Sequence, residues 1–236
     1  MNPQLRKRFI DSIEYLRRMD FFKDYSNLSS EEIFDRILSG EISYETHWFA
    51  EEWSKEERRK MKEEDIRERP LEEMFEEREE HWMKASDFEV DLRLAFFDSK
   101  RFFVEDDETV IERGMCKMLM RKLARISRGV FKPTYIREKM LEWKWEPPPA
   151  LGKAYHDAGF TFKVCFRFKG EEHSAEFYSD GDYLHMDPLV RKINELIKDT
   201  GYQYYCPGDS NYIVYAVFSS DEVERLKKRG WSFFPI

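Results

Sequence analysis

Residues 159–199 read GFTFKVCFRFKGEEHSAEFYSDGDYLHMDPLVRKINELIKD and carry the clearest structural pattern in the chain. Apolar and polar side chains alternate from residue 160 to residue 169, which predicts a strand with one buried face. Gly170 marks a turn, and the run 172–178 completes a hairpin. In this pairing Lys163 and Arg167 lie beside Glu172 and Glu176, where opposite charges contribute roughly 0.2–1 kcal/mol each.

The segment after this hairpin predicts a helix with Asp187 as its N-cap and Pro188 in its first turn. The runs 202–206 and 212–218 flank a turn and predict a second hairpin. Residues 213–218 are apolar on both faces, so we expect them at the centre of a sheet that helices cover. Ser219 and Glu222 predict a capping box for a last helix.

Composition indicates a folded, acidic and soluble protein. The chain has 236 residues and a formal net charge of −8, with 37% charged and 41% hydrophobic residues. No apolar run is long enough to span a membrane, and the first residues lack the apolar core of a secretory signal. We therefore expect a cytoplasmic protein without a membrane partner. Cys116, Cys165 and Cys206 lie far apart, which favours neither a disulfide framework nor a zinc site.

The N-terminal part of the chain predicts a charged helical region over residues 1–86. Asn2 with Pro3 predicts the start of a first helix, and Ser29 with Glu32 predicts a capping box for a second. Ser43 is expected to begin a third helix, and residues 51–84 carry an excess of acids.

This acidic stretch has two interpretations. The first is a solvated helical arm held by i,i+4 ion pairs. The second is an arm that binds a partner, and we call its residues the acidic arm. They are Glu72, Glu73, Glu76, Glu77, Glu80 and Trp82.

The middle of the chain shows a change from helical to mixed patterns. Alternation over 88–96, a turn at 98–100 and the run 101–105 predict a hairpin, and residues 109–127 predict a helix. Pro133 is expected to open a short helix over 134–143, and three prolines at 147–149 predict a stiff linker.

The predicted elements indicate an α+β protein. A helical, charged N-terminal region precedes a mixed, mainly antiparallel sheet built of hairpin-plus-helix units. The expected domains are a helical region (1–86), a hairpin with a basic helix (87–146) and a ββαββα domain (150–236). In the alternative division, residues 87–236 form one α+β domain.

Basic residues recur along the helix predicted over 109–127, and we call them the basic stripe: Arg113, Lys117, Arg121, Arg125 and Arg128. One interpretation is structural, because bases near the end of a helix match its dipole. A second is a face that follows the phosphates of a nucleic acid, with further bases up to Lys132. A third is pairing with the acidic run at 72–80. The overall negative charge favours the internal pairing or a protein partner over nucleic acid.

Two acidic clusters are weak candidates for metal sites. The first comprises residues 105–108 with Asp98, and the second comprises Asp180, Asp182 and His185 before the cap at Asp187. No cofactor is expected, because the sequence lacks a glycine-rich phosphate loop and a nucleophile elbow.

Other reactive side chains have simpler interpretations. His173 lies on an apolar strand face, where a packed histidine is favoured over a base. Cys165 lies beside Lys163 and Arg167, which could activate a thiolate, although a small packed residue is favoured.

The sequence favours binding over catalysis. We expect a non-enzymatic cytoplasmic protein that interacts with or regulates another protein through the acidic arm, with an inhibitor- or immunity-like role as one form. The first alternative is a metal-dependent hydrolase acting on phosphodiesters. The second is a nucleic-acid-binding protein that uses residues 113–132.

Overall fold

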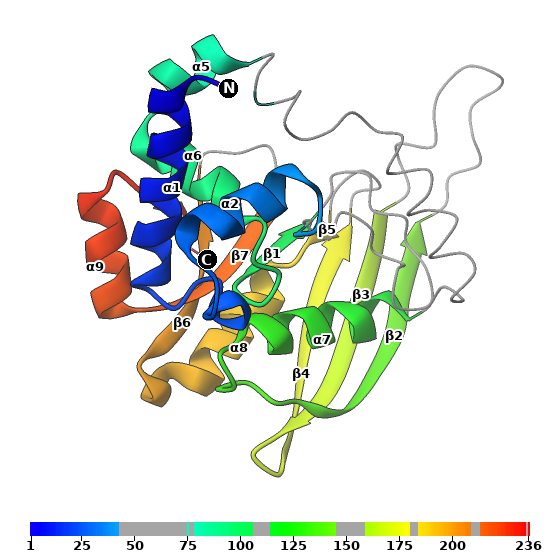
Figure 1. Cartoon of the computed structure of the whole chain (residues 1–236). Helices are drawn as coiled ribbons and strands as arrows, with labels where there is room; N and C mark the ends of the chain where they lie inside the picture. The colour runs from blue at the N-terminus through cyan, green and yellow to red at the C-terminus, as the bar shows by residue number, and fades with distance from the viewer. Residues whose placement is uncertain are drawn as a thin grey trace, which may run out of the picture. The chain divides into compact units, whose positions relative to one another are not determined.

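The computed structural model describes residues 1–42, 75, 78–105, 114–144, 159–179, 184–208, 213–234 and 236 (Figure 1). The chain forms two compact units. Unit 1 comprises Met1–Ser99 with Lys228–Gly230, and unit 2 comprises Lys100–Lys227 with Trp231–Ile236. The helical N-terminal region and the antiparallel sheets confirm the α+β class that the sequence predicts.

Unit 1 is built of helices. They are α1 (Pro3–Arg17), the short 3-10 helix η1 (Lys23–Tyr25), α2 (Ser30–Leu38), α5 (Glu79–Lys84) and α6 (Asp87–Ala95). Helix α1 buries one face and contacts α2, α5 and α6. The predicted helix starts are confirmed. The side chain of Asn2 accepts a hydrogen bond from the backbone of Gln4, and Ser29 and Glu32 form a capping box.

Residues 88–96 do not form the predicted strand and belong to helix α6 instead. Ser86 and Glu89 form a second capping box, with the backbone N–H of each donating to the side chain of the other at 2.6 and 3.2 Å. Helix α6 buries Val90 and Leu94 and packs on α1. The N-terminal cap and this packing outweigh the alternating pattern. Strand propensity depends strongly on context, so the pattern alone is weak evidence for a strand.

The first sheet of unit 2 has the strand order β1-β7-β6-β8. Its strands are β1 (Phe102–Glu105), β6 (Tyr202–Pro207), β7 (Ile213–Ser219) and β8 (Phe233–Phe234). Strand β7 lies between β1 and β6, and its residues Val214 to Phe218 are fully buried, which confirms its predicted central place. The expected hairpin of 88–96 with 101–105 is wrong, because β1 pairs with β7. The sequence does not indicate this long-range pairing.

The second sheet has the order β2-β3-β4-β5. Its strands are β2 (Thr134–Lys144), β3 (Gly159–Phe168), β4 (Glu171–Ser179) and β5 (Leu184–His185). The predicted register of the β3–β4 hairpin is confirmed, with Lys163 opposite Glu176 and Arg167 opposite Glu172. The inner face buries Phe162, along with other apolar side chains of β3 and β4.

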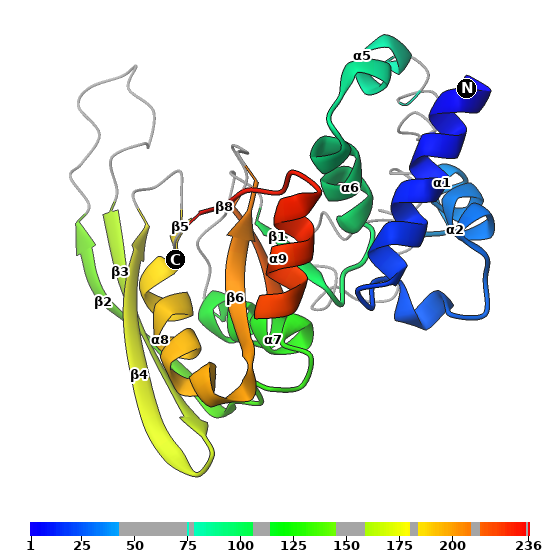
Figure 2. The same ribbon diagram turned by 90° about the vertical axis from the view of Figure 1, so that its left-hand side faces the viewer.

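Helices cover the inner sides of both sheets in unit 2. Helix α8 (Asp187–Ile197) contacts β4 and β6, and α7 (Met115–Ile126) contacts β1, β2, β3 and β7 (Figure 2). Helix α9 (Ser220–Lys228) begins with the capping box that Ser219 and Glu222 predict. The opposite face of β2, β3 and β4 carries no described helix or strand (Figure 2).

Two further local predictions are wrong. Residues 134–143 are strand β2 and not a helix, because pairing with β3 outweighs their helix propensity. The N-cap of α8 is Met186, so Asp187 is the first helical residue, and its carboxylate accepts a hydrogen bond from the Tyr215 hydroxyl at 3.2 Å. The helix predicted from Ser43 and the linker at 147–149 lie outside the described residues.

Candidate functional site

The acidic arm lies mostly outside the described residues. Glu72, Glu73, Glu76 and Glu77 belong to that part of the chain. Glu80 is exposed on α5 and forms an i,i+4 ion pair with Lys84 at 2.5 Å. Only Glu80 and Trp82 of the arm can therefore be placed, and partner binding through it stays a prediction.

Trp82 belongs to the aromatic core of unit 1. Its ring lies 5.9 Å from the ring of Phe9 and 5.8 Å from that of Phe75, measured between centroids. The side chain is 9% exposed, whereas the neighbouring Met83 is 42% exposed. Burial of a tryptophan among aromatic rings stabilises the attachment of α5 to α1. At this helix a partner would meet Met83 and the carboxylates instead of the indole.

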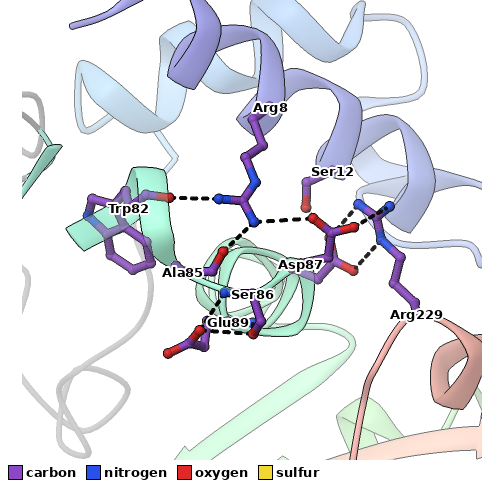
Figure 3. Close-up of polar contacts among 9 residues, drawn as sticks. Arg8, Ser12, Trp82, Ala85, Ser86, Asp87, Glu89 and Arg229 are labelled. Carbon is purple, nitrogen blue, oxygen red and sulfur yellow. Dashed lines mark hydrogen bonds and ion pairs between the residues drawn. The ribbon is translucent and has the colours of Figure 1, made fainter. Parts of the chain in front are cut away.

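A polar cluster joins the helices of unit 1 (Figure 3). Arg8 donates to the backbone carbonyl oxygens of Trp82 and Ala85 at 2.7 and 2.5 Å, and so ties α1 to the end of α5. Asp91 is fully buried, accepts from the Ser12 hydroxyl and pairs with Arg229 at 3.1 Å. These groups satisfy one another, so the cluster holds the helices together and does not itself indicate a ligand site.

The basic stripe divides into exposed and internally paired residues. Arg113 lies outside the described residues, and Lys117 and Arg121 are exposed on α7. Arg128 forms an ion pair with Glu222 at 2.6 Å and lies 4.8 Å from the centre of the Tyr202 ring. Arg125 is partly buried. Two described cations of the stripe thus remain on the surface, and nucleic-acid binding there stays a prediction.

The predicted metal ligands are not brought together within the described residues. Asp180 and Asp182 lie outside them, and the ring of His185 stacks on the ring of Tyr178 at 4.3 Å. Asp98 is buried in unit 1, where it accepts a hydrogen bond from the backbone of Phe22 at 2.6 Å. The residues that the structure describes contain no group of three or more potential metal ligands. Residues 106–108 lie outside the described part of the chain.

Glu138 has a carboxylate of the kind that functional sites use, and the sequence did not single it out. Its carboxylate accepts hydrogen bonds from the backbone N–H groups of Gly114 and, at 3.1 Å, Cys116, at the N-terminus of α7. A carboxylate is favourable there because the helix dipole is positive at this end. Burial, with Glu138 as a second cause, raises the pKa of the Cys116 thiol to about 12. Cys116 therefore stays a protonated thiol at neutral pH.

A groove of about 460 Å³ lies on unit 2 where α9 approaches the β6 and β8 strands. Its lining includes Asn194, Glu224, Lys227 and the exposed Phe234. Asn194 binds the backbone of Tyr204, and Lys227 pairs with Glu224 at 3.4 Å. Because these polar groups satisfy one another, they offer a ligand few free partners.

The solvent-facing side of the second sheet carries a mixed surface that the sequence patterns do not indicate. We call it the outer face, and its residues alternate with the buried ones along each strand. They include Thr134, Tyr135, Arg137, Lys139 and Leu141 of β2, Thr161, Lys163, Cys165 and Arg167 of β3, and Glu172, Ser174, Glu176 and Tyr178 of β4, and the register also sets Glu142 of β2 opposite Thr161. His185 of β5 lies opposite Tyr178.

Tyr135 lies on this face because β2 is bulged. Thr134 pairs with Arg167 and Arg137 pairs with Cys165, so Tyr135 and Ile136 together oppose one residue of β3. Tyr135 has a φ of 51°, in the left-handed region that side chains rarely adopt. The guanidinium of Arg167 lies 4.8 Å from the centre of its ring. The β-branched Thr134 and Ile136 were the signal for a strand here.

The outer face carries three of the exposed large apolar side chains. Tyr135, Tyr178 and Leu141 are 67%, 49% and 36% exposed. Among the described residues, the other exposed large apolar side chains are Met83 and Phe234, which lie on separate elements. Tyrosine and arginine together are enriched where proteins bind one another.

None of the described helices has the length and apolar character needed to cross a membrane. Comparison with known proteins gives no relative from which a role could be transferred. No family model, no curated protein and no solved structure matches this chain.

Proposed function

We propose that this chain is an interaction protein that binds another protein through the outer face of the β2–β5 sheet. The observation that carries the proposal is that Tyr135, Leu141 and Tyr178 are all exposed on one sheet face, with Tyr135 beside Arg167 at one end and the other two near Thr161 at the other end. No described helix covers that face, whereas α7 and α8 cover the other (Figure 2). Exposed apolar surface with a polar rim is a feature of protein interaction sites.

The charges around these rings support binding to a protein. Lys163 pairs with Glu176 and Arg167 pairs with Glu172, each at 3.0 Å. The face therefore presents both signs of charge within one surface, as the rim of a protein interface does. Nucleic acid would meet carboxylates as well as bases here, which opposes binding of a continuous phosphate backbone.

Photo-cross-linking in the cells that produce the protein tests the proposal. A benzophenone side chain replaces Tyr135 in one variant and Tyr178 in a second. In a control variant it replaces Arg121, which is exposed on α7. We expect the two outer-face positions to form the same discrete adduct, because one partner covers both strands. Adducts that are absent from both positions, or that form equally from position 121, would contradict the proposal.

A further inference from the structure

Among the described residues, the outer side of β2 is a free edge of the second sheet. In the order β2-β3-β4-β5, strand β2 is terminal, so no described strand pairs with its outer edge. At 11 residues it is longer than β3 and β4, which have 10 and 9 residues. A long terminal strand presents a row of backbone N–H and C=O groups that can pair with another chain.

In the first sheet, by contrast, the comparable edge of β6 is covered. Strand β8 pairs with β6 at Cys206 and Pro207, and farther along β6 the side chain of Asn194 takes the place of a strand. Its amide donates to the carbonyl oxygen of Tyr204 at 3.0 Å and accepts from the N–H of Tyr204 at 2.7 Å. This amide blocks strand addition at β6. At the outer edge of β2, by contrast, the described residues provide no pairing strand.

Near the free edge of β2, the outer face carries positive charges that have no acidic partner among the described residues. Along β3, Lys163 and Arg167 each face a glutamate of β4. Along β2, by contrast, Lys139 lies directly opposite Lys163, a like-charge pair that destabilises a sheet. Arg137 and Lys139 are exposed and form no ion pair with a described residue. A strand beyond β2 with acidic side chains on the outer face would supply the missing partners.

Edge strands are also protected against aggregation by lysines and bulges, and β2 has both. Its register is irregular between Thr134 and Arg137 and again between Met140 and Glu142. Between these points residues 137–140 keep a regular register, so a short straight segment remains on which another strand can pair. The two exposed bases lie on this segment. Side chains on one face of a strand repeat about every 6.6–6.8 Å, so the acids of an added strand would meet both bases.

We propose that an extended acidic segment of the partner protein adds as a strand to the free edge of β2. Its backbone pairs with residues 137–140, and carboxylates at alternate positions face Arg137 and Lys139. This inference rests on the proposed function and names the chemistry of the partner. It parallels the way in which β4 already presents Glu172 and Glu176 to β3.

Fluorescence anisotropy with synthetic peptides tests the inference on the full-length chain. The probe is a labelled peptide of alternating glutamate and threonine, with a lysine–threonine peptide as its charge control. A third peptide keeps the glutamates but carries N-methyl groups that remove one row of backbone N–H donors. The protein variants are Arg137→Glu/Lys139→Glu and, with the same change in net charge, Lys117→Glu/Arg121→Glu on α7. Circular dichroism checks that both variants are folded.

We expect the glutamate peptide to bind the unmodified protein and the α7 variant equally, and to bind the β2 variant at least about tenfold more weakly. The N-methylated peptide is expected to lose a similar factor, because it keeps the charges but cannot extend the ladder. Equal loss in both variants, or undiminished binding of the N-methylated peptide, would overturn strand addition.

Two other results would assign the edge to a different occupant and overturn the inference. One is binding of an oligothymidylate that is tighter than binding of the glutamate peptide and that the Arg137→Glu/Lys139→Glu variant loses. The other is concentration-dependent self-association that Lys139→Glu abolishes. If no peptide binds while the cross-links from positions 135 and 178 persist, the outer face remains a binding surface. In that case only the proposal of an added acidic strand is contradicted.

Discussion

At the scale of single residues, N-terminal caps decide where the helices of unit 1 begin. Ser29 with Glu32 and Ser86 with Glu89 form complete capping boxes. The first box was recognised in the sequence, and the second was missed because the residues after it alternate like a strand. In both, the backbone N–H of the serine donates to the glutamate, which lowers the pKa of Glu32 and of Glu89 below its ordinary value.

The box at the start of α6 gives a prediction for stability and pH. Replacing Ser86 by alanine is expected to lower the free energy of unfolding by about 1 kcal/mol, because a backbone donor loses its acceptor. A carboxylate whose pKa is lower in the folded than in the unfolded state stabilises above its unfolded pKa. That contribution disappears as the pH falls through the folded pKa.

Glu89→Gln should therefore destabilise at neutral pH and have little effect well below pH of about 4. Urea unfolding followed by circular dichroism at several pH values measures this difference. Lys7→Ala, an exposed change on α1, is the control and should stay within about 0.5 kcal/mol. An unchanged Ser86→Ala variant would show that tertiary packing alone holds α6.

At the scale of elements, long-range contacts outweighed local pattern in two places. Residues 88–96 alternate like a strand but form α6, and residues 134–143 are rich in helix formers but form β2. Strand β2 pairs with β3, and α6 packs on α1, so each is decided by a surface that the local sequence does not contain. The β3–β4 hairpin was predictable because its partners are adjacent in the chain and its charges specify the register.

At the same scale, ion pairs hold residues 228–230 in unit 1. Arg229 pairs with the fully buried Asp91 at 3.1 Å and with Asp87 at 3.0 Å. Removing one partner of a buried pair leaves an uncompensated charge, which costs roughly 3–5 kcal/mol. Because Arg229 is partly exposed, we expect Arg229→Ala to cost an amount near the lower end of that range.

Hydrogen exchange of the α1 and α6 amides measures the effect of Arg229→Ala within unit 1. Lys228→Ala, which changes the exposed neighbouring residue, is the control. Adding Asp91→Asn to Arg229→Ala should recover part of the loss, because the buried charge is then gone. Exchange that is equal in Arg229→Ala and Lys228→Ala would show that the ion pair contributes no net stability.

At the scale of the whole molecule, the α+β class could be predicted from sequence, whereas the candidate site could not. The outer face joins residues of β2 with residues of β3 and β4, and it appears only when 134–144 is paired as a strand. Nearly all the residues that the sequence pointed to are charged, and Trp82 is an exception. Trp82 packs in the core and Arg128 pairs with Glu222, because large apolar and basic side chains also stabilise folded units.

Quantitative affinity capture tests the central claim, that the outer face binds a protein partner. The unmodified chain, a Tyr135→Ser/Arg137→Glu/Lys139→Glu variant and the charge-matched Lys117→Glu/Arg121→Glu variant are immobilised. Each is exposed to extract from the cells that produce the protein, and the captured protein is then purified and bound again directly. We expect the outer-face variant to lose this protein and the α7 variant to keep it. Loss from the α7 variant, with full binding by the outer-face variant, would contradict the account and place the binding surface on the basic stripe.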